Sequence, residues 1–277
     1  MNPAGLDRAL KALGPYLDDV IICGAWAWYL YRRCLAPPRW IPDEFTRDLD
    51  CIGRERLEVQ DAHLLDRLEA YDFEWVPRGS ETPPVAHFAW PEQRRAEVVI
   101  EFLVPARGDA SRRIVEMQPG LTAQALRHLE ILTDEPLDLA IDDDSPLARE
   151  MEFRGTIKLP TVGCFVVQKA LIHSRRGRDE QVKDLFYVVE LLDRENGLSA
   201  RCRREVVAAD ARWKGAVDQL VEMLDKRSRE SRFLAALSEH YPVERRPPRA
   251  YFEREIRTWL EQLQEARRGD TIPPADP

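Results

Sequence analysis

Long apolar runs are missing from this chain. No run of about 18 apolar residues occurs among its 277 residues, so we expect no membrane span. The first residues lack the basic-then-apolar layout of a secretory signal. An excess of positive charge is missing too, because the net charge is −8. This charge argues against broad, unspecific nucleic-acid binding, although it leaves room for a local basic groove.

Cysteine is scarce and scattered. The five cysteines stand at positions 23, 34, 51, 164 and 202, and none belongs to a Cys-x-x-Cys pair. Their odd number, and the apolar neighbours of three of them, predict buried thiols in a reducing cytoplasm. The five histidines are equally dispersed and show no ligand spacing, so we do not expect a zinc site.

Two aspartates form the most informative short motif. Asp48 and Asp50 flank the apolar Leu49 within the segment Phe45–Cys51. In a strand, the two-residue period points both carboxylates to one face and Leu49 to the other. Adjacent carboxylates repel unless a cation lies between them, and oxygen ligands suit Mg²⁺ or Mn²⁺. The alternative without a metal is a polar strand edge or an N-cap aspartate.

A glycine stands between an expected strand and an expected helix. The apolar run Val20–Cys23 is typical of a buried strand, and Ala25–Tyr31 is typical of a buried helix. Gly24 therefore lies at a strand-to-helix turn, where free backbone N–H groups can hold a phosphate. The alternative is a tight turn that only needs a residue without a side chain.

A third carboxylate lies inside an apolar segment. The segment Ala96–Val104 is rich in Val and Ile and predicts a strand, yet it contains Glu101. A lone carboxylate is costly in such surroundings. Glu101 either joins Asp48 and Asp50 or, with Glu97, faces solvent at a sheet edge.

The chain changes character at Pro160, from mixed strands and helices to helices alone. We predict an α/β (α+β) fold with a mixed sheet in residues 1–160, a helical domain in residues 161–267 and a flexible tail in residues 268–277. The acidic triplet Asp142–Asp144 predicts a solvated turn. The expected helices are Leu6–Leu17, Leu57–Tyr71, Val162–Ser174, Gln181–Leu192, Arg203–Ala211, Trp213–Leu224, Ser228–Ser238 and Tyr251–Ala266. The expected strand pairs are Phe73–Val76 with Val85–Trp90, and Leu129–Ile141 with Glu150–Leu159.

Lys169 lies near the middle of the apolar helix expected at Val162–Ser174. It either extends its ammonium group to the surface or faces a cleft that holds an anion. In the second case, we expect Lys169→Ala to weaken anion binding and to leave stability almost unchanged. On the next helix, Lys183 and Asp184 either form a surface pair of little energetic value or contribute to the same site, where Asp184 would orient Lys169.

Taken in order, these elements resemble the polymerase-β-like nucleotidyltransferase superfamily. The resemblance rests on Phe45-Thr46-Arg47-Asp48-Leu49-Asp50, on the segment from Lys169 to Arg175, and on Lys183-Asp184, and it covers residues 18 to 192. The sequence looks closest to the AbiEii-type branch, which includes the toxins of toxin–antitoxin systems.

The resemblance implies a Mg²⁺-dependent (or Mn²⁺-dependent) enzyme that moves a nucleoside monophosphate from a nucleoside triphosphate to an acceptor hydroxyl. The acceptor would be RNA such as tRNA, a protein or a small molecule, and an antitoxin protein would be a possible partner. Asp48, Asp50 and Glu101 would be the metal ligands, and Asp184 would complete the catalytic set. The implied nucleotide-binding residues are Gly24, Ala25, Thr46, Lys169, Arg175 and Lys183, with Lys169 and Arg175 six residues apart on one helix.

Two departures from the family pattern support a second hypothesis. The family usually has a Gly-Gly or Gly-Ser pair where this chain has Gly24-Ala25, and its third carboxylate is usually Asp where this chain offers Glu101. The alternative is therefore a catalytically inactive module of the same fold that binds a nucleotide or a partner protein.

Overall fold

The computed structural model describes residues 2–36, 46–78, 85–92, 95–106, 114–194 and 197–268. Nearly all of the tail predicted at residues 268–277 lies outside these residues. The chain divides into two compact units. Unit 1 comprises Met1–Leu30 and Phe45–Pro160, and unit 2 comprises Tyr31–Glu44 and Thr161–Pro277.

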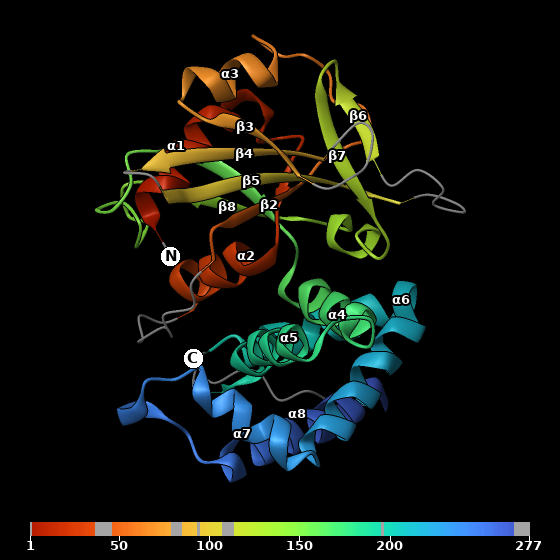
Figure 1. The fold of residues 1–277 in the computed structure, drawn as a ribbon. Coiled ribbons are helices and arrows are strands. Elements are labelled where there is room, and N and C mark those ends of the chain that lie inside the picture. Colours follow the sequence, from red (N-terminus) through yellow and green to blue (C-terminus); the bar gives the residue numbers. More distant parts are fainter. Residues whose placement is uncertain are drawn as a thin grey trace. The chain divides into compact units, whose positions relative to one another are not determined.

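Unit 1 is built on a mixed sheet (Figure 1). Its main path has the strand order β3-β4-β5-β2-β1-β9-β8, and β7 extends the sheet by pairing with β5 and β6. The pairs β2–β5 and β1–β9 are parallel, and β1–β2 is antiparallel. The strands are β1 (Ile21–Ile22), β2 (Asp48–Ile52), β3 (Glu74–Arg78), β4 (Val85–Glu92), β5 (Arg95–Pro105), β6 (Ile114–Gln118), β7 (Leu121–Leu126), β8 (Leu137–Ile141) and β9 (Gly155–Leu159).

One face of this sheet forms the core of unit 1. Helices α1 (Pro3–Leu13) and α3 (Leu64–Ala70) lie on one side of the sheet, and α2 (Gly24–Leu30) lies on the other (Figure 1). On the first side, Gly5 of α1 packs directly against Val98. The core-facing side chains of the three central strands are almost fully buried: Leu49, Cys51, Phe88, Val98, Ile100 and Phe102. Strand β2 alternates from Asp48 to Cys51, as expected for a strand with one buried face, whereas β5 is also buried on its other face at Val99 and Leu103.

Helix α3 is shorter than the helix expected at Leu57–Tyr71. Residues 57–63 are irregular because tertiary hydrogen bonds hold them: the Leu57 N–H donates to the Met117 carbonyl at 3.0 Å. At the start of α3, the Gln118 side chain accepts a hydrogen bond from the Leu64 N–H at 3.0 Å. This side chain satisfies one of the N–H groups that a helix start leaves free, so α3 begins there.

The hairpin of β6 and β7 was not among the expected elements. Its two strands pair antiparallel around Pro119-Gly120, and Gly120 has a φ of +80°. A Pro-Gly pair is typical of a turn whose second central residue needs a positive φ. The pair β3–β4 confirms the first predicted hairpin. The pair β8–β9 confirms the second hairpin only near its turn, because Glu130–Thr133 forms a 3₁₀ helix and residues 150–154 are not part of a strand.

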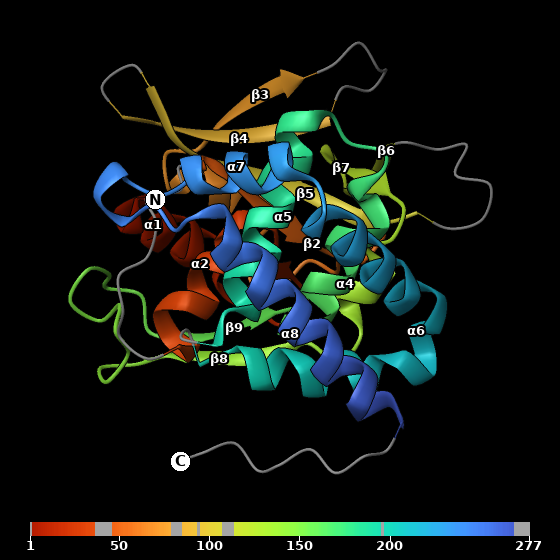
Figure 2. The ribbon, with the colours of Figure 1, turned by 90° about the horizontal axis from the view of Figure 1, so that it is seen from below.

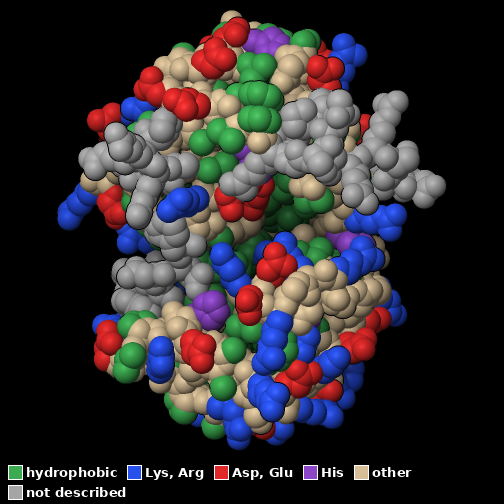
Figure 3. Space-filling model, viewed as in Figure 1, with side chains coloured by type: hydrophobic (Ala, Val, Ile, Leu, Met, Phe, Trp, Pro, Cys, Tyr) green, Lys and Arg blue, Asp and Glu red, His purple; other side chains and the backbone are tan. Residues whose placement is uncertain are grey.

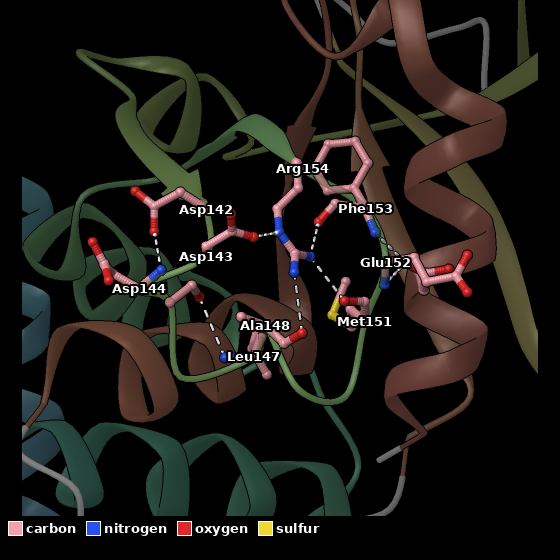
Figure 4. Close-up of polar contacts among 11 residues, drawn as sticks. Asp142, Asp143, Asp144, Leu147, Ala148, Met151, Glu152, Phe153 and Arg154 are labelled. Carbon is pink, nitrogen blue, oxygen red and sulfur yellow. Dashed lines mark hydrogen bonds and ion pairs between the residues drawn. The ribbon is translucent and has the colours of Figure 1, made fainter.

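The loop that joins β8 to β9 is organised around Arg154 (Figure 4). Its guanidinium group lies 2.7 Å from a carboxylate oxygen of Asp143 and donates to the carbonyls of Ala148, Met151 and Phe153 at 3.1, 2.8 and 2.9 Å. The three aspartates at 142–144 are exposed, which confirms the predicted solvated turn.

Unit 2 is helical in the part of the chain that the structure describes. Helix α6 packs along α4 and α8 (Figures 1 and 2). The break expected between the helices Arg203–Ala211 and Trp213–Leu224 is present as a kink at Trp213, where the non-helical φ of −124° and ψ of 34° divide α6 into two helical segments. The helices are α4 (Val162–His173), α5 (Arg178–Leu192), α6 (Ser199–Ser228), α7 (Ser231–Glu239) and α8 (Arg249–Arg268). A mixed sheet followed by a helical region confirms the predicted fold class.

All five cysteines lie in the described residues, none forms a disulfide, and Cys34 alone of the five is not buried. This agrees with the expectation of buried thiols. Among the described residues, no helix is long and apolar enough to cross a membrane.

Candidate active site

The register between β2 and β5 brings the three predicted carboxylates to one face of the sheet. The two strands run parallel, with Asp48 opposite Val99 and Asp50 opposite Glu101. Residues directly opposite each other, and residues two apart along a strand, share a face. Asp48, Asp50 and Glu101 therefore lie on the face opposite the core, and all three are half-buried. Glu101 is not a residue of an outer edge strand, because β5 has β4 on one side and β2 on the other.

A histidine continues the row formed by Asp50 and Glu101. His87 on β4 lies opposite Glu101, and its Nδ1 is 3.1 Å from the Glu101 Oε1. His87 is buried, with 7% of its surface exposed. His87 is not among the residues predicted from the sequence, because its spacing from the carboxylates along the chain does not form a motif. The alternation along β4 and the hairpin register are the signals that identify it.

Gly24 lies against the Asp50 carboxylate. It is the first residue of α2 and has a φ of +64°. A Cβ atom at this position would lie 2.0 Å from the Asp50 Oδ2. The glycine is therefore needed both for its backbone conformation and for the space that the carboxylate occupies. Beside it, the Cys23 N–H donates to the Asp50 carbonyl at 2.9 Å, which fixes the turn to β2.

The carboxylate oxygens on this face are of the type that binds hard divalent cations. Carboxylate oxygens are preferred ligands of Mg²⁺ and Mn²⁺, and the register places three carboxylates on a common face. Within the described residues, however, no three His, Cys, Asp or Glu side chains are already gathered as a metal-binding group. On the core face, burial raises the pKa of the Cys51 thiol, and the charge of Asp50 raises it further, so this thiol is not a candidate ligand.

Two predicted nucleotide-binding residues flank these groups in unit 1. Thr46 is half-buried and precedes β2, and Ala25 is the second residue of α2 and is 8% exposed. Next to Thr46, the Arg47 carbonyl accepts a hydrogen bond from the Val99 N–H at 2.8 Å, which continues the alignment of β2 with β5. The backbone pairing with β5 thus holds the motif in place from Arg47 onward.

In unit 2, Lys169 forms a buried ion pair with Asp184. The Lys169 Nζ lies 2.9 Å from the Asp184 Oδ1, and 8% and 3% of the two side chains are exposed. Arg176 approaches the other oxygen of Asp184 at 3.3 Å. Lys169 does not extend to the surface, and Asp184 is not half of an exposed pair with Lys183. The contact provides the geometry for Asp184 to orient Lys169.

This ion pair corrects one expectation. Lys169→Ala was expected to leave stability almost unchanged. Removal of Lys169 would leave the buried Asp184 carboxylate with the Arg176 guanidinium 3.3 Å away and without the closer ammonium group. Breaking a buried pair in this way is strongly destabilising.

The other basic candidates are more exposed. Arg175 is exposed and lies two residues beyond His173, the last residue of α4, so it does not share a helix with Lys169 as expected. The chain leaves the helix at this point, after the C-cap Ser174. Lys183 is half-buried on α5, with its Nζ 5.8 Å from the centre of the Tyr187 ring.

Comparison with protein families identifies the chain. A family model described as nucleotidyltransferase matches residues 4–194, which is most of the chain. The chain belongs to this nucleotidyltransferase family. The matched region includes every site residue predicted from the sequence, from Gly24 to Asp184. Membership supports nucleotidyl transfer as the general reaction.

A solved structure is also similar to this chain. The crystal structure of an antigenic nucleotidyltransferase-like protein from Paracoccidioides brasiliensis is 13% identical, with 76% of this chain and 92% of that chain covered and a TM-score of 0.35. No curated protein matches the chain.

Proposed function

We propose that the chain is a Mg²⁺-dependent nucleotidyltransferase whose metal ligands are Asp48, Asp50 and Glu101. The observation that carries this proposal is the register of β2 and β5, which sets Asp50 directly opposite Glu101 and Asp48 two residues away on the same face. Three half-buried carboxylates on one face repel one another, and a divalent cation offsets that repulsion. Membership in the nucleotidyltransferase family supports the reaction class.

In the proposed reaction, an acceptor hydroxyl attacks the α-phosphorus of a nucleoside triphosphate and pyrophosphate leaves. Bound Mg²⁺ would lower the pKa of the hydroxyl and offset the charge of the leaving group. Asp48 and Asp50 would hold the cations, and Glu101 would complete the ligand set on the side of the acceptor. Gly24 keeps open the space in which the Asp50 carboxylate lies.

The nucleotide ligands belong to the same proposal. We assign backbone amides at Gly24 and Ala25, together with Thr46, to the triphosphate. In unit 2, Lys169, Arg175 and Lys183 are the proposed basic ligands, and Asp184 orients Lys169. Arg175 is exposed and can reach a ligand from the surface. Lys169 would contact the ligand while its ammonium group stays paired with Asp184.

For the acceptor, we propose RNA such as tRNA, with a protein or a small molecule as alternatives. A role as the toxin of a toxin–antitoxin system, as in the AbiEii-type branch, would add an antitoxin protein as partner. These possibilities give different labelled products, so a single assay with each acceptor class distinguishes them.

The test combines cation binding with nucleotide transfer. We expect calorimetric titration with Mn²⁺ to show binding that Asp48→Asn removes. The exposed carboxylate of Asp66, on α3, provides the control, because Asp66→Asn should bind Mn²⁺ as the wild type does. Labelled nucleoside triphosphates with Mg²⁺ and total tRNA should then label the acceptor with the wild type and not with Asp48→Asn. Mn²⁺ binding unaffected by Asp48→Asn would contradict the proposed site. Nucleotide binding without transfer to any acceptor would favour the inactive module.

A further inference from the structure

A surface hollow lies between α4 and α6 in unit 2. Its volume of about 350 Å³ is within the range of roughly 300 to 1,000 Å³ that is usual for small-molecule sites. Ala170 and Met223 give the hollow an apolar wall, and its polar lining includes His173, Lys226 and Arg227. None of the residues assigned above to the triphosphate or to the cation lines it, so a molecule bound here would be a second ligand.

The hydrogen bond between Arg227 and His173 fixes the place of the proton on the imidazole ring. The Arg227 Nε donates to the His173 Nε2 at 2.9 Å. A guanidinium nitrogen only donates, so Nε2 must accept, and the ring carries its proton on Nδ1. Burial, and secondly the charge of Arg227, lower the pKa of His173 to about 4, so the ring is neutral at pH 7.

This proton has no acceptor within the residues that the structure describes. The His173 Nδ1 is buried, and no group in the described part of the chain forms a hydrogen bond with it. A buried N–H group without an acceptor destabilises the folded state, and in native proteins such a group calls for an explanation. Because His173 also lines the hollow, a ligand bound there lies against the ring and can supply the missing acceptor.

The guanidinium group of Arg227 is held in place before any ligand binds. Besides His173, it donates to the side chains of Glu230 and Gln181, and its Cζ lies 3.8 Å from the centre of the Phe233 ring. Among the described residues, these hydrogen bonds use one N–H on each nitrogen, so each terminal nitrogen keeps a second N–H. A donor that is already ordered loses little entropy when a ligand arrives.

Lys226 adds a second cation to the lining. Its side chain is exposed on α6 and forms no ion pair within the described ranges of the chain. The lining thus offers N–H donors from His173, Lys226 and Arg227, and its acidic side chain is Glu222. A phosphate group matches such donors, because its oxygens accept several charge-assisted hydrogen bonds at once.

We propose that the hollow between α4 and α6 binds a small phosphomonoester. Its phosphate oxygens accept hydrogen bonds from His173, Lys226 and Arg227. The organic part of the ligand lies against Ala170 and Met223. All of these residues belong to unit 2, and the proposal does not rest on the cation site proposed for unit 1.

The test uses AMP as the probe and the full chain, with EDTA present so that metal-dependent nucleotide binding does not contribute. With ¹⁵N-labelled histidine, NMR should show His173 protonated at Nδ1, and millimolar AMP should shift that signal. The signal of His173 is identified by its loss in His173→Gln. An unchanged His173 signal at saturating AMP would overturn the proposal, since water would then be the partner of Nδ1.

A lysine on the same helix provides the matched control. We expect Lys226→Gln to weaken AMP binding by about tenfold, because it removes one of the two cations of the lining. Lys214 is also exposed on α6 but does not line the hollow, so Lys214→Gln should bind AMP as the wild type does. An equal loss in both variants would show general attraction by positive charge and would refute this site.

Inorganic phosphate tests the two parts of the ligand separately. We expect it to shift the same His173 signal, with an affinity about tenfold lower than that of AMP, because it makes no contact with the apolar wall. Equal affinities would refute the part assigned to Ala170 and Met223.

Thermal melts distinguish ligand binding from a role at the end of α4, where a cation is favourable. If Lys226→Gln lowers the melting temperature and leaves AMP affinity unchanged, Lys226 only stabilises the helix end and the proposal is wrong.

Discussion

The two units treat their buried and half-buried carboxylates differently. Unit 1 has 16 basic and 27 acidic residues, which give a net charge of −11. Three of its carboxylates lie on one face of the sheet. Unit 2 has 25 basic and 22 acidic residues, a net charge of +3, and pairs its buried carboxylate Asp184 with Lys169 and Arg176. The visible surface in Figure 3 shows many Lys and Arg side chains on the helical unit.

A second buried pair in unit 2 follows the same principle. Arg32 and Glu190 are 3% exposed each, and the Arg32 Nε lies 3.4 Å from the Glu190 Oε2. The Tyr241 hydroxyl donates to the same carboxylate. Burial is the main cause that raises the pKa of Tyr241, and the charge of Glu190 raises it further, so this hydroxyl stays protonated and able to donate.

The ion-paired carboxylates of unit 2 contribute to the stability of the fold, whereas the carboxylates on the sheet face of unit 1 are placed to bind a ligand. When a buried carboxylate loses one of its cationic neighbours, the free energy of unfolding falls strongly, because the charge stays buried without compensation. Under the proposed function, a divalent cation would offset the repulsion among the carboxylates on the sheet face of unit 1. We therefore expect substitutions in unit 2 to lower stability, and substitutions at the sheet face of unit 1 to act mainly on binding.

The largest effect is expected from Lys169→Met. The substitution removes the charge that lies 2.9 Å from Asp184 and keeps most of the side-chain volume. We expect a loss of about 3 kcal/mol in the free energy of unfolding, because Asp184 would remain buried with less compensation. Urea unfolding at pH 7 measures it.

The double variant Lys169→Met/Asp184→Leu is the control for this prediction. Because it removes both charges, it should recover much of the stability that the single variant loses. If Lys169→Met stays within about 1 kcal/mol of the wild type, the pair does not hold α4 to α5, and the contrast between the units weakens.

The next effect concerns pH. His173 on α4 is 4% exposed, and the Arg227 Nε donates to its Nε2 at 2.9 Å. Burial, and secondly the charge of Arg227, lower the pKa of His173 from 6.5 to about 4. The folded state therefore keeps His173 neutral where the unfolded chain takes up a proton. The resulting stability is fully present above pH 6.5 and is lost as the pH falls to about 4, by roughly 2 to 3 kcal/mol.

The measurement compares wild type and His173→Gln by urea unfolding from pH 7 to pH 4.5. The variant has no group that titrates at this position, so its stability should fall less steeply with decreasing pH over that range. Parallel curves for the two proteins would show that His173 does not titrate differently in the folded and unfolded states.

The smallest effect on stability is expected from Gly24→Ala. The new Cβ would require a φ of +64° in alanine and would displace the Asp50 carboxylate. We expect a cost of about 1 to 2 kcal/mol and, because Asp50 moves, a clear loss of Mn²⁺ affinity. Thermal melts and calorimetry measure the two effects.

Gly215 provides the matched glycine control. It lies within α6, and no atom would lie within 4 Å of a Cβ added there. We expect Gly215→Ala to stabilise the protein by about 1 kcal/mol, since alanine is the better helix former, and to leave Mn²⁺ binding alone. Equal Mn²⁺ affinity in Gly24→Ala and wild type would show that Gly24 does not define the place of Asp50.

Much of the local structure could be predicted from the sequence. The two-residue alternation around Leu49 identifies a strand with two carboxylates on one face, and the Val- and Ile-rich segment around Glu101 identifies its neighbour. The apolar helix that contains Lys169 was also correctly predicted, although it ends before Arg175. These patterns are visible because the spacing of apolar residues reflects burial on one side of a single element.

Other features depended on contacts between distant segments. The expected helix from Leu57 lost its first turns to hydrogen bonds with Met117 and Tyr16, about 60 and 40 residues away. The β6–β7 hairpin was missed although the sequence contains its Pro119-Gly120 turn, so that signal was available. The contact between Lys169 and Asp184 was one of two alternatives that the sequence left open, and the packing of α4 against α5 decided between them.

By itself, the sequence determined which residues carry charge, which faces of strands and helices are apolar, and that Asp48 and Asp50 share a face. Tertiary structure alone decided that Asp50 stands opposite Glu101, that His87 completes the row, and that Gly24 leaves room for a carboxylate. The physical reason is register. Alternation along one strand is a local property of the backbone, whereas the alignment of two strands is set by the packing of the whole sheet, and a shift by one residue would move every side chain to the other face.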